Sequence, residues 1–361
     1  MKEVSSPTKK TILVINPGST STKTAVYEDE RAVWMSGGHH DADAADGLRT
    51  VEQQYAFRRD YILSLLHEAH IPLRFDAVIG RGGLLHPLHG GVYAVNERMK
   101  NDLLYGSEQH VCNLGALIAD EIAAQCGCPA YIADPVVVDE MELRARLTGI
   151  AGIERRSVFH ALNSKAAARK YAASQGRRYD DVNLIVAHLG GGISISAHRR
   201  GRVIDVNNAL NGEGPFSPER AGTLPAGQLA ELCFSGKYTL AQIKKLLSGR
   251  GGLVSHLGTN DMITIAANAE VGKEPYRSVL DAMLYTVAKQ IGAMAVALGG
   301  DVDAIILTGG IAYSAHCIAV LQPQIRFLAP IAVMPGEGEM ESLAYNALGA
   351  LRGELPVYEY A

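Results

Sequence analysis

The hydrophobic pattern of the chain contains two strand–turn–strand units that resemble each other. Residues 12–23 read ILVINPGSTSTK, an apolar run followed by glycine and hydroxyl residues, and residues 184–196 read LIVAHLGGGISIS. The two segments align without a gap at an offset of 172 residues, and a second strand-type segment follows in each copy. The matched pairs include Val14 with Val186, Gly18 with Gly190 and Ala25 with Ala197. We therefore expect one β-hairpin in each half of the protein.

Strand-type and helix-type patterns alternate along the rest of the chain. Short apolar runs and two-residue alternation predict strands at residues 12–16, 24–28, 31–35, 77–80, 130–133 and 304–314, besides the second hairpin at 184–206. Helical spacing predicts helices at 51–69, 97–105, 112–126, 160–174, 226–234, 239–247, 276–298 and 340–353. The glycine-, proline- and histidine-rich segment 81–96 predicts a long loop. This alternation indicates two α/β domains with a cleft between them.

The two turns carry groups that suit phosphate oxygens. Glycine lets the backbone approach a ligand, and hydroxyls beside backbone N–H groups form a concave set of donors. The first turn offers Gly18, Ser19, Thr20, Ser21, Thr22 and the charge of Lys23, and the second offers Gly190, Gly191 and Gly192. Clusters of this kind are usually plain turns. Because the cluster occurs twice, we expect both turns to bind the phosphates of one polyanionic ligand.

Two common glycine-rich motifs do not fit these turns. A P-loop needs a second glycine directly before its lysine, and counting from Gly18 that slot holds Lys23 itself. The chain then continues as TAVYED, which alternates like a strand. A dinucleotide-binding fingerprint fails at residues 190–192, since a strand pattern and not a helix follows them.

Polar residues follow several predicted strands. Asn16, Arg81, Asp134 and His188 each stand at the carboxyl end of a strand, where ligands gather in open α/β sheets, so these four could converge. Asp134 precedes a proline and could equally start a plain turn.

Two arginines in glycine-rich surroundings suit the binding of a carboxylate or phosphate. Arg81 is followed by Gly82 and Gly83, and a guanidinium beside bare backbone favours bidentate capture of such an anion. Arg220, in GEGPFSPERAGTLP, is a second candidate, although that stretch could be an ordinary surface loop.

Composition excludes several classes of partner. The 361 residues are 47% hydrophobic and 20% charged with a net charge of −4, which suits two sizeable cores and gives no reason to expect nucleic acid. We expect no membrane span, because no apolar run approaches the roughly 18 residues that a span needs. The charged segment 1–10 lacks the apolar stretch of a signal peptide, so we expect a cytoplasmic protein.

Cysteine and histidine clusters do not predict a metal site. The five cysteines are scattered, and Cys126 and Cys128 lack a second pair, so we expect buried or inert thiols. Residues 39–41 (HHD) lie between glycines and DADAAD, which favours a solvated loop.

The chain resembles the butyrate kinases, within the acetate-kinase branch of the actin-like, sugar-kinase and Hsp70-like ATPases. The matching stretches run in order along nearly the whole chain. They include INPGSTSTKTAVYE, GRGGLLHPLHGGVYAVNE, ADPVVVDEME, VFHALNSKAAARKYA, VAHLGGGISISAH, VIDVNNALNGEGPFSPERAG, DAIILTGGIAYS and MPGEGEMESLA. The resemblance implies reversible, ATP-dependent phosphorylation of a short-chain fatty acid to an acyl phosphate by direct in-line transfer. It also implies duplicated ribonuclease-H-like domains, at residues 1–160 with 345–361 and at 161–344.

The resemblance assigns catalytic and acceptor-binding roles by position. Asp134 matches the carboxylate that orients the acceptor and the metal, and His188 matches the donor to the transferred group. Arg81 and Arg220 match the pair that holds the acceptor carboxylate and the γ-phosphoryl. His160 and His110 match further active-site histidines with weaker roles.

The resemblance also implies residues for ATP or ADP and for Mg²⁺. The first phosphate loop contains Asn16, Gly18, Ser19, Thr20 and Lys23, and the second contains Gly190, Gly191 and Gly192. Gly309, Gly310 and Ile311 match the adenosine-binding turn. Asn16 and Glu339 match the residues that lie next to Mg²⁺ in the family. Glu337 and Glu341 are so close in the sequence that either of them could match the glutamate instead.

Substrate size and assembly stay open at this point. Gly82 and Gly83 stand where acetate kinases carry bulky aliphatic residues, which favours butyrate over acetate because each buried methylene contributes about 0.8 kcal/mol. A branched-chain, propionate or acetate kinase is the alternative, as is a non-kinase actin-like or Hsp70-like ATPase. The resemblance further implies a homo-oligomer, a dimer or higher.

Overall fold

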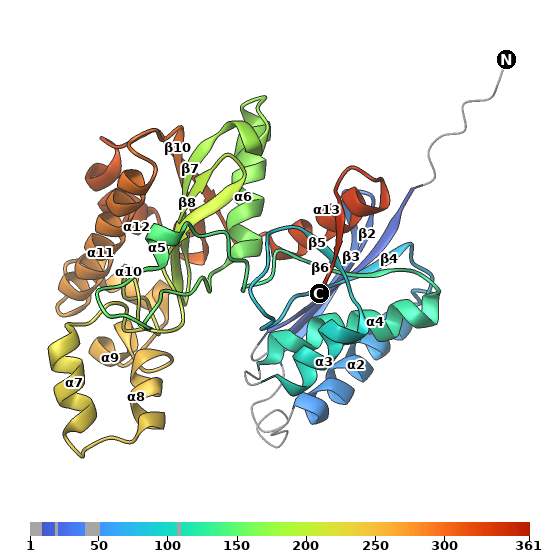
Figure 1. Ribbon diagram of the computed structural model, residues 1–361, viewed down its shortest axis with the longest axis horizontal. Coiled ribbons are helices and arrows are strands. Elements are labelled where there is room, and N and C mark those ends of the chain that lie inside the picture. Colours follow the sequence, from blue (N-terminus) through green and yellow to red (C-terminus); the bar gives the residue numbers. More distant parts are fainter. Residues whose placement is uncertain (1–8, 19–20, 40–50, 107–109) are drawn as a thin grey trace. The chain divides into compact units, whose positions relative to one another are not determined.

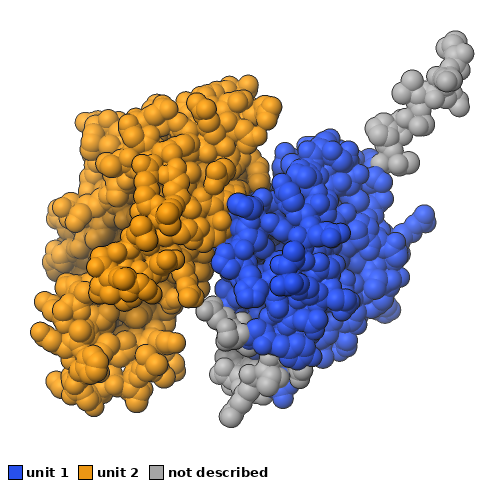
Figure 2. All heavy atoms as spheres, viewed as in Figure 1, with its two compact units in different colours: residues 1–138, 338–361 blue, residues 139–337 orange. Residues whose placement is uncertain are grey.

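The computed structural model describes residues 9–18, 21–39, 51–106 and 110–361. The chain forms two compact units, which Figure 2 distinguishes by colour. Unit 1 comprises residues 1–138 and 338–361, and unit 2 comprises residues 139–337. The domain limits expected from the sequence, after residue 160 and before residue 345, stay a prediction.

Unit 1 is built on a seven-stranded mixed sheet of order β12-β5-β6-β4-β1-β2-β3. Its strands are β1 (Thr11–Pro17), β2 (Ser21–Glu28), β3 (Arg31–His39), β4 (Ala77–Arg81), β5 (Val92–Ala94), β6 (Ala130–Ala133) and β12 (Val357–Glu359). β1, β2 and β3 form an antiparallel meander, whereas β4 runs parallel to both β1 and β6. Parallel neighbours bring the carboxyl ends of β1, β4 and β6 to one edge of the sheet.

Helices cover both faces of the unit 1 sheet (Figure 1). They are α2 (Val51–Glu68), α3 (Glu97–Tyr105), α4 (Leu114–Cys126) and α13 (Glu339–Leu351). Odd-numbered apolar residues of β1, Leu13 and Ile15, pack in a core with α2 and α4. Since side chains alternate across a strand, Val14 and Asn16 face the other side, where α13 packs on β1 and β4.

Two glycines allow α4 to pack directly on β4. A side chain at Gly80 would place its Cβ 2.0 Å from the carbonyl oxygen of Gly115, and one at Gly115 would lie 2.3 Å from the carbonyl oxygen of Arg81. The helix backbone therefore touches the strand backbone where β4 ends. This contact sets the position of Arg81 at the edge of the sheet.

Unit 2 contains a five-stranded sheet of order β11-β10-β7-β8-β9. Its strands are β7 (Asn183–Leu189), β8 (Ile193–Arg199), β9 (Arg202–Val206), β10 (Ala304–Gly309) and β11 (Ile331–Pro335). Its helices are α5 (Leu143–Arg146), α6 (Ala161–Ser174), α7 (Ala226–Phe234), α8 (Leu240–Leu247), α9 (Gly252–Leu257), α10 (Met262–Glu270), α11 (Tyr276–Ala297) and α12 (Ala315–Ile325). The sheet lies between α6 on one face and α11 with α12 on the other (Figure 1).

The two units share one topology, which confirms the expected duplication. Five strands of unit 1 follow the order β3-β2-β1-β4-β6, and unit 2 repeats it as β9-β8-β7-β10-β11 with the same parallel and antiparallel pairs. The gap-free alignment needs one correction. Pro17 pairs with Thr22 in the first hairpin and Leu189 pairs with Ile193 in the second, so the second turn is one residue shorter.

Most predicted elements are present, and the errors fall in short ones. The strand predicted at 304–314 ends at Gly309, whose φ of +88° leaves the strand region, and a 3₁₀ turn follows at Gly310–Tyr313. The predicted loop 81–96 contains β5. The sequence reading missed α5, α9, α10, α12, β11 and β12.

Helix α11 is long and apolar enough, by length and composition only, to cross a membrane, and the core helix of a folded domain passes the same test. Among the helices of the described residues it alone passes this test. Its buried residues include Leu280, Met283, Val287 and Ile291, which belong to the core against the unit 2 sheet. Packing on that sheet accounts for the apolar character of the helix.

We predict that Gly80→Ala destabilises the protein while Gly292→Ala does not. The first variant forces a Cβ against the backbone of Gly115, and such overpacking costs about 1–3 kcal/mol. Gly292 lies within α11 with open space around its α-carbon, so alanine there should stabilise the helix by roughly 0.5–1 kcal/mol. Denaturant unfolding of both variants checks this, and equal midpoints would contradict it.

Candidate active site

Three polar side chains meet at the carboxyl edge of the unit 1 sheet. Asn16 is the next-to-last residue of β1, Arg81 is the last residue of β4, and Glu339 is the first residue of α13. The Asn16 amide nitrogen donates to Glu339 Oε2 at 2.7 Å, and Arg81 Nη1 lies 3.3 Å from the same oxygen and 3.5 Å from Asn16 Oδ1. The expected convergence of strand-end residues is therefore confirmed for Asn16 and Arg81.

Glu339 is distinguished from its neighbours by burial. It is 9% exposed and faces Asn16 and Arg81, whereas Glu341 is exposed. Glu337 is exposed at the end of unit 2, and its backbone carbonyl accepts a hydrogen bond from Asn163.

Asp134 follows the neighbouring strand β6 on the same edge, since Arg81 pairs with Ala133. The side chain is 1% exposed, and its Oδ1 accepts from the backbone N–H of Gly91 at 2.8 Å. Its φ is +39°, and it is the one buried residue among the described non-glycine residues with positive φ. Positive φ is uncommon in non-glycine residues, and buried residues held in it are often found at functional sites. An aspartate that only started a turn before Pro135 would not need to be buried.

The glycines after Arg81 serve packing, which corrects the expectation that they leave room for a longer acid. A Cβ at Gly82 would lie 2.6 Å from Pro135 Cβ, and one at Gly83 would lie 2.4 Å from Asn113 Oδ1. The space beside both glycines is thus filled by protein atoms. The fully buried Asn113 holds this segment, because its Oδ1 accepts from the N–H of Leu84 at 2.9 Å.

His110 lies just before a 3₁₀ turn at Val111–Asn113 and caps it. Its Nδ1 lies 3.3 Å from the backbone nitrogen of Cys112 and 3.0 Å from Cys112 Sγ. Burial raises the pKa of the Cys112 thiol to about 11, so this thiol is not a nucleophile at neutral pH. Of the five cysteines, all free, Cys112 and Cys317 are buried, Cys126 and Cys128 are half-buried, and Cys233 is exposed. The expectation of buried or inert thiols is therefore confirmed as to burial for Cys112 and Cys317.

A buried arginine anchors the first glycine turn. Arg58 on α2 is 1% exposed, and its Nη1 donates to the Ser21 carbonyl and to Thr22 Oγ1, both at 2.8 Å. Lys23 is exposed and pairs with Asn16 across the hairpin, so both side chains point to the α13 face. The N–H of Gly18 donates to the Ser21 carbonyl at 2.8 Å. Ser19, Thr20, His40 and Asp41 lie outside the described residues.

In unit 2 a pair of stacked imidazoles lies under α6. The rings of His160 and His188 are 3.8 Å apart between centroids and inclined by only 11°. His188 is 2% exposed at the end of β7, and its Nδ1 lies 2.7 Å from Asn163 Oδ1. His160 Nδ1 lies 2.8 Å from Ser194 Oγ. His160 and His188, which the sequence analysis selected as site residues, are therefore neighbours. Both lie in unit 2, whereas Arg81 and Asp134 lie in unit 1.

The second glycine turn holds the guanidinium of Arg220. A Cβ at Gly192 would lie 1.9 Å from Arg220 Nη1, so only glycine fits there. Nη1 donates to the Ala209 carbonyl at 2.5 Å, and burial lowers the pKa of Arg220 from its usual value. Ser217 Oγ donates to the Gly191 carbonyl at 2.7 Å, and Gly190 N–H donates to the Gly192 carbonyl at 3.2 Å.

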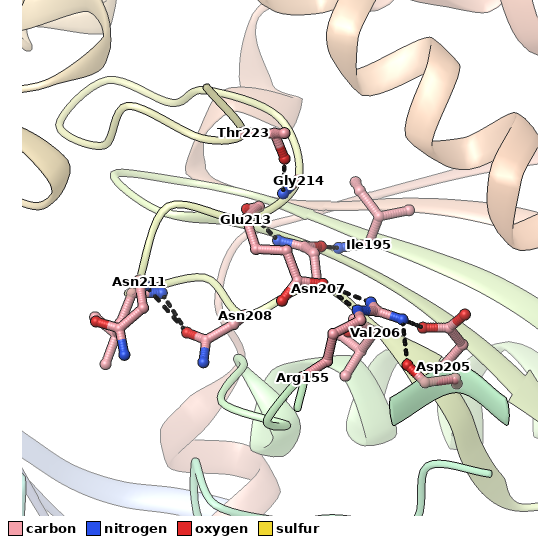
Figure 3. Close-up of polar contacts among 12 residues, drawn as sticks. Arg155, Ile195, Asp205, Val206, Asn207, Asn208, Asn211, Glu213, Gly214 and Thr223 are labelled. Atoms are coloured by element: carbon pink, nitrogen blue, oxygen red, sulfur yellow. Dashed lines mark hydrogen bonds and ion pairs between the residues drawn. The ribbon is translucent and has the colours of Figure 1, made fainter. Parts of the chain in front are cut away.

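The segment that carries Arg220 is not a loose surface loop, because the Ala221 N–H donates to the Leu247 carbonyl at 3.0 Å and the Ser217 N–H donates to the Arg220 carbonyl at 3.0 Å. The stretch just before it is anchored by the polar contacts shown in Figure 3. Asn207 is fully buried, accepts from the Ile195 N–H at 2.7 Å and donates to the Ile193 carbonyl at 3.0 Å. Arg155 binds Asp205 Oδ1 at 2.9 Å and Glu213 Oε1 at 2.6 Å. These contacts tie residues 205–213 to the hairpin that contains the second glycine turn.

The turn at residues 309–311 exposes bare backbone. Gly309 packs against the Leu189 backbone with a φ of +88°, and it exchanges two backbone hydrogen bonds of 3.0 Å with Gly336. Gly310 is exposed with open space at its α-carbon, and Ile311 is buried in the core. Such a turn could admit a flat, bulky ligand.

Sequence reasoning missed the residues that hold others in place. They are Arg58, Asn113, Arg155, Asn163 and Asn207. One signal was available, since NSK at 163–165 interrupts an alanine-rich helical pattern with three polar residues, all of which are buried.

Solved structures similar to this chain include kinases of acetate and propionate. A crystal structure of Porphyromonas gingivalis acetate kinase matches with a TM-score of 0.75 at 18% identity, covering 95% of this chain and 100% of that one. A propionate kinase from Francisella tularensis matches with a TM-score of 0.72 at 18% identity, covering 93% and 98%. At this identity the likeness shows the fold, which is that of the actin-like ATPases.

Sequence comparison shows the family. The profile of the acetokinase family matches residues 142–329. A protein of Phocaeicola vulgatus named probable butyrate kinase is 69% identical over 97% of this chain and 99% of its own length. A Bacteroides thetaiotaomicron protein of the same name is 57% identical over 97% of this chain and 99% of its own length. The chain belongs to the acetokinase family.

We predict that Arg58→Met lowers the free energy of unfolding by about 1.5–3 kcal/mol, because hydrogen bonds from a charged group are lost inside the protein. Arg59→Met is the matched control one position along α2, where the side chain is 28% exposed and forms ion pairs with Asp60 and Glu121 at the surface. We expect a much smaller loss there. Urea unfolding of both variants checks this, and equal losses would contradict the anchoring role.

Proposed function

We propose that the protein transfers the γ-phosphoryl group of ATP to the carboxylate of a short-chain fatty acid, butyrate foremost, and runs the reverse reaction to make ATP. A carboxylate oxygen forms a bond to the γ-phosphorus as the bond to the β–γ bridging oxygen breaks, giving an acyl phosphate and ADP. Family membership and the relatives named probable butyrate kinase support this activity. The observation that carries it is the buried Asp134 at positive φ beside Arg81 on the unit 1 sheet edge.

The chemistry explains why cationic groups dominate the site. The acid is already ionised at neutral pH and needs no base, so the barrier comes mainly from bringing two anions together. Arg81 would hold the acceptor carboxylate, with Asp134 orienting it, and Arg220 would hold the γ-phosphoryl. His188 would donate a hydrogen bond to the transferred group, with His160 stacked on it. His110 would border the acceptor.

Nucleotide binding is assigned to the glycine turns. Phosphates would lie at residues 18–23 and 190–192, where backbone and hydroxyl groups and Lys23 offer donors or charge. The adenosine would lie at residues 309–311, where the exposed α-carbon of Gly310 leaves the backbone bare.

The residues present fit a Mg²⁺ ion that takes most of its ligands from phosphates and water. No group of three or more histidine, cysteine or acidic side chains suited to a metal occurs in the described residues. Asn16 and Glu339 supply one amide oxygen and one buried carboxylate, and Mg²⁺ in kinases commonly uses one or two protein oxygens. When bound there, the ion would neutralise charge on the phosphate oxygens.

An acyl-phosphate assay tests the activity. We expect ATP, Mg²⁺ and butyrate to give a hydroxylamine-trapped product, with butyrate preferred over acetate. One methylene changes rates only about 10–200-fold, so propionate, isobutyrate and valerate should react as well. ATP hydrolysis at the same rate with and without acid would contradict the proposal and indicate a non-kinase ATPase. A preference for acetate or propionate would correct the substrate alone.

Two substitutions test the acceptor side. We predict that Arg81→Ala and Asp134→Asn each lower kcat about a hundredfold or more with the fold intact, as loss of one preorganised group usually does. Arg177→Ala is the control, because Arg177 forms an exposed ion pair with Asp303. Circular dichroism would verify folding, and near-normal turnover in either variant would remove that residue from the mechanism.

Location and assembly complete the proposal. A reaction that uses ATP and a free fatty acid fits the cytoplasm. We also propose a homo-oligomer, a dimer or higher, which light scattering of the purified protein would measure.

A further inference from the structure

A buried amide lies at the centre of the polar network under α6, and the proposed function gives it no role. Asn163 lies in the first turn of α6 and is 3% exposed. It lies between the end of β7, where His188 stands, and the end of β10, where Thr308 stands. Its partners His188, Thr308, Gly336 and Glu337 all belong to unit 2.

The partners of Asn163 determine which way its amide points. Its Nδ2 donates to the carbonyl oxygens of Gly336, at 3.3 Å, and Glu337. Thr308 Oγ1, 3.5 Å from Nδ2, donates its own proton to the Gly336 carbonyl at 3.0 Å. A reversed amide would bring an oxygen against these carbonyls, where no proton is available. The oxygen Oδ1 must therefore face His188.

This orientation determines the tautomer of His188. An amide oxygen only accepts hydrogen bonds, so the proton of the 2.7 Å contact must sit on His188 Nδ1. The other ring nitrogen, Nε2, is directed to the second glycine turn, because a Cβ at Gly190 would lie 3.0 Å from it. Nε2 is thus the nitrogen presented to a phosphate at residues 190–192, and a second proton there makes the ring a cationic donor.

We propose that Asn163 is a positioning residue that keeps the proton on His188 Nδ1 and directs Nε2 at the second glycine turn. The amide holds the edge of the imidazole, while the stacked ring of His160 holds its face. Asn163 also ties His188 to the Gly336–Glu337 backbone beside the turn at Gly309. The functional consequence rests on the proposed phosphoryl transfer, whereas the tautomer assignment does not.

Nitrogen NMR of the full-length, ligand-free protein tests the tautomer directly. Uniform ¹⁵N labelling of histidine would give imidazole signals for 12 residues, and His188→Gln would identify the signals of His188. At a pH where the ring is neutral, we expect His188 of the wild type to carry its proton on Nδ1 and to have an unprotonated Nε2. Asn163→Leu should shift His188 toward a mixture or toward the Nε2–H form.

A second variant separates the two roles of the amide. Asn163→Asp keeps an acceptor toward His188 but replaces the donor toward Gly336 and Glu337 by another oxygen. We expect it to retain the Nδ1–H tautomer of His188 while lowering thermal stability. Asn163→Leu should lose the Nδ1–H preference of His188 and should also have lower thermal stability than the wild type. Asn183→Ala is the matched control, since Asn183 is a buried amide at the opposite end of β7 that donates to Asp301 at 2.8 Å.

Kinetics measure the consequence for catalysis. We expect Asn163→Leu to lower kcat about 10–100-fold, as loss of a residue that orients a functional histidine does at metal sites, with KM for the acid changed less than about threefold. In the His188→Gln background the same substitution should have little further effect. Asn163→Asp should recover part of kcat, and its pH profile should differ from that of the wild type. Asn183→Ala should keep kcat within about twofold.

Several outcomes would overturn the inference. An Nε2–H tautomer in the wild type, or an unchanged His188 spectrum in Asn163→Leu, would show that the amide does not hold the proton. Full additivity of the Asn163 and His188 substitutions would show that Asn163 acts elsewhere. If the wild type forms no acyl phosphate while the NMR result stands, the proposed function fails and the positioning role survives.

Discussion

Near the carboxyl end of the first strand of each unit, a buried polar side chain needs a hydrogen-bond partner from the protein because water does not reach it. The rest of the site is arranged around this constraint. Asn16 and His188 are the next-to-last residues of β1 and β7, at matching positions of the duplicated hairpin, and both are almost fully buried. In each case a helix on the same face supplies the partner, Glu339 from α13 and Asn163 from α6. A buried polar group without a partner costs about 1–3 kcal/mol, so sheet and helix are linked at these points.

The duplication preserves architecture while the chemistry of the two edges differs. Thr24 donates to the Val14 carbonyl at 3.0 Å, and Ser196 donates to the Val186 carbonyl at 3.2 Å, so a hydroxyl of the second strand binds the same carbonyl of the first strand in both hairpins. The two hydroxyls differ in register, because Thr24 pairs with Ile15 whereas Ser196 pairs with Val186. The strand-end residue, however, is an amide in one unit and an imidazole in the other. The same scaffold can thus present a carboxylate–arginine cluster on one sheet and a histidine pair on the other.

Glycine in this protein mainly lets backbones and large side chains come together. Gly80 and Gly115 allow α4 to touch β4, and Gly192 accommodates the guanidinium of Arg220. Gly82 is enclosed by Pro135 and Ile132 in the same way. Selectivity for a larger acid therefore needs an explanation other than the missing side chains at 82 and 83.

The sequence by itself determined the duplicated hairpins, most long elements, and the strand-end positions of Asn16, Arg81, Asp134 and His188, because periodicity and strand-end polarity are local signals. Tertiary structure alone decided which residues meet. Glu339 lies 323 positions from Asn16, and Arg58 reaches Ser21 from another helix. The packing at Gly82 and the proton position on His188 were likewise not readable, since each depends on atoms that only the folded chain brings within contact distance.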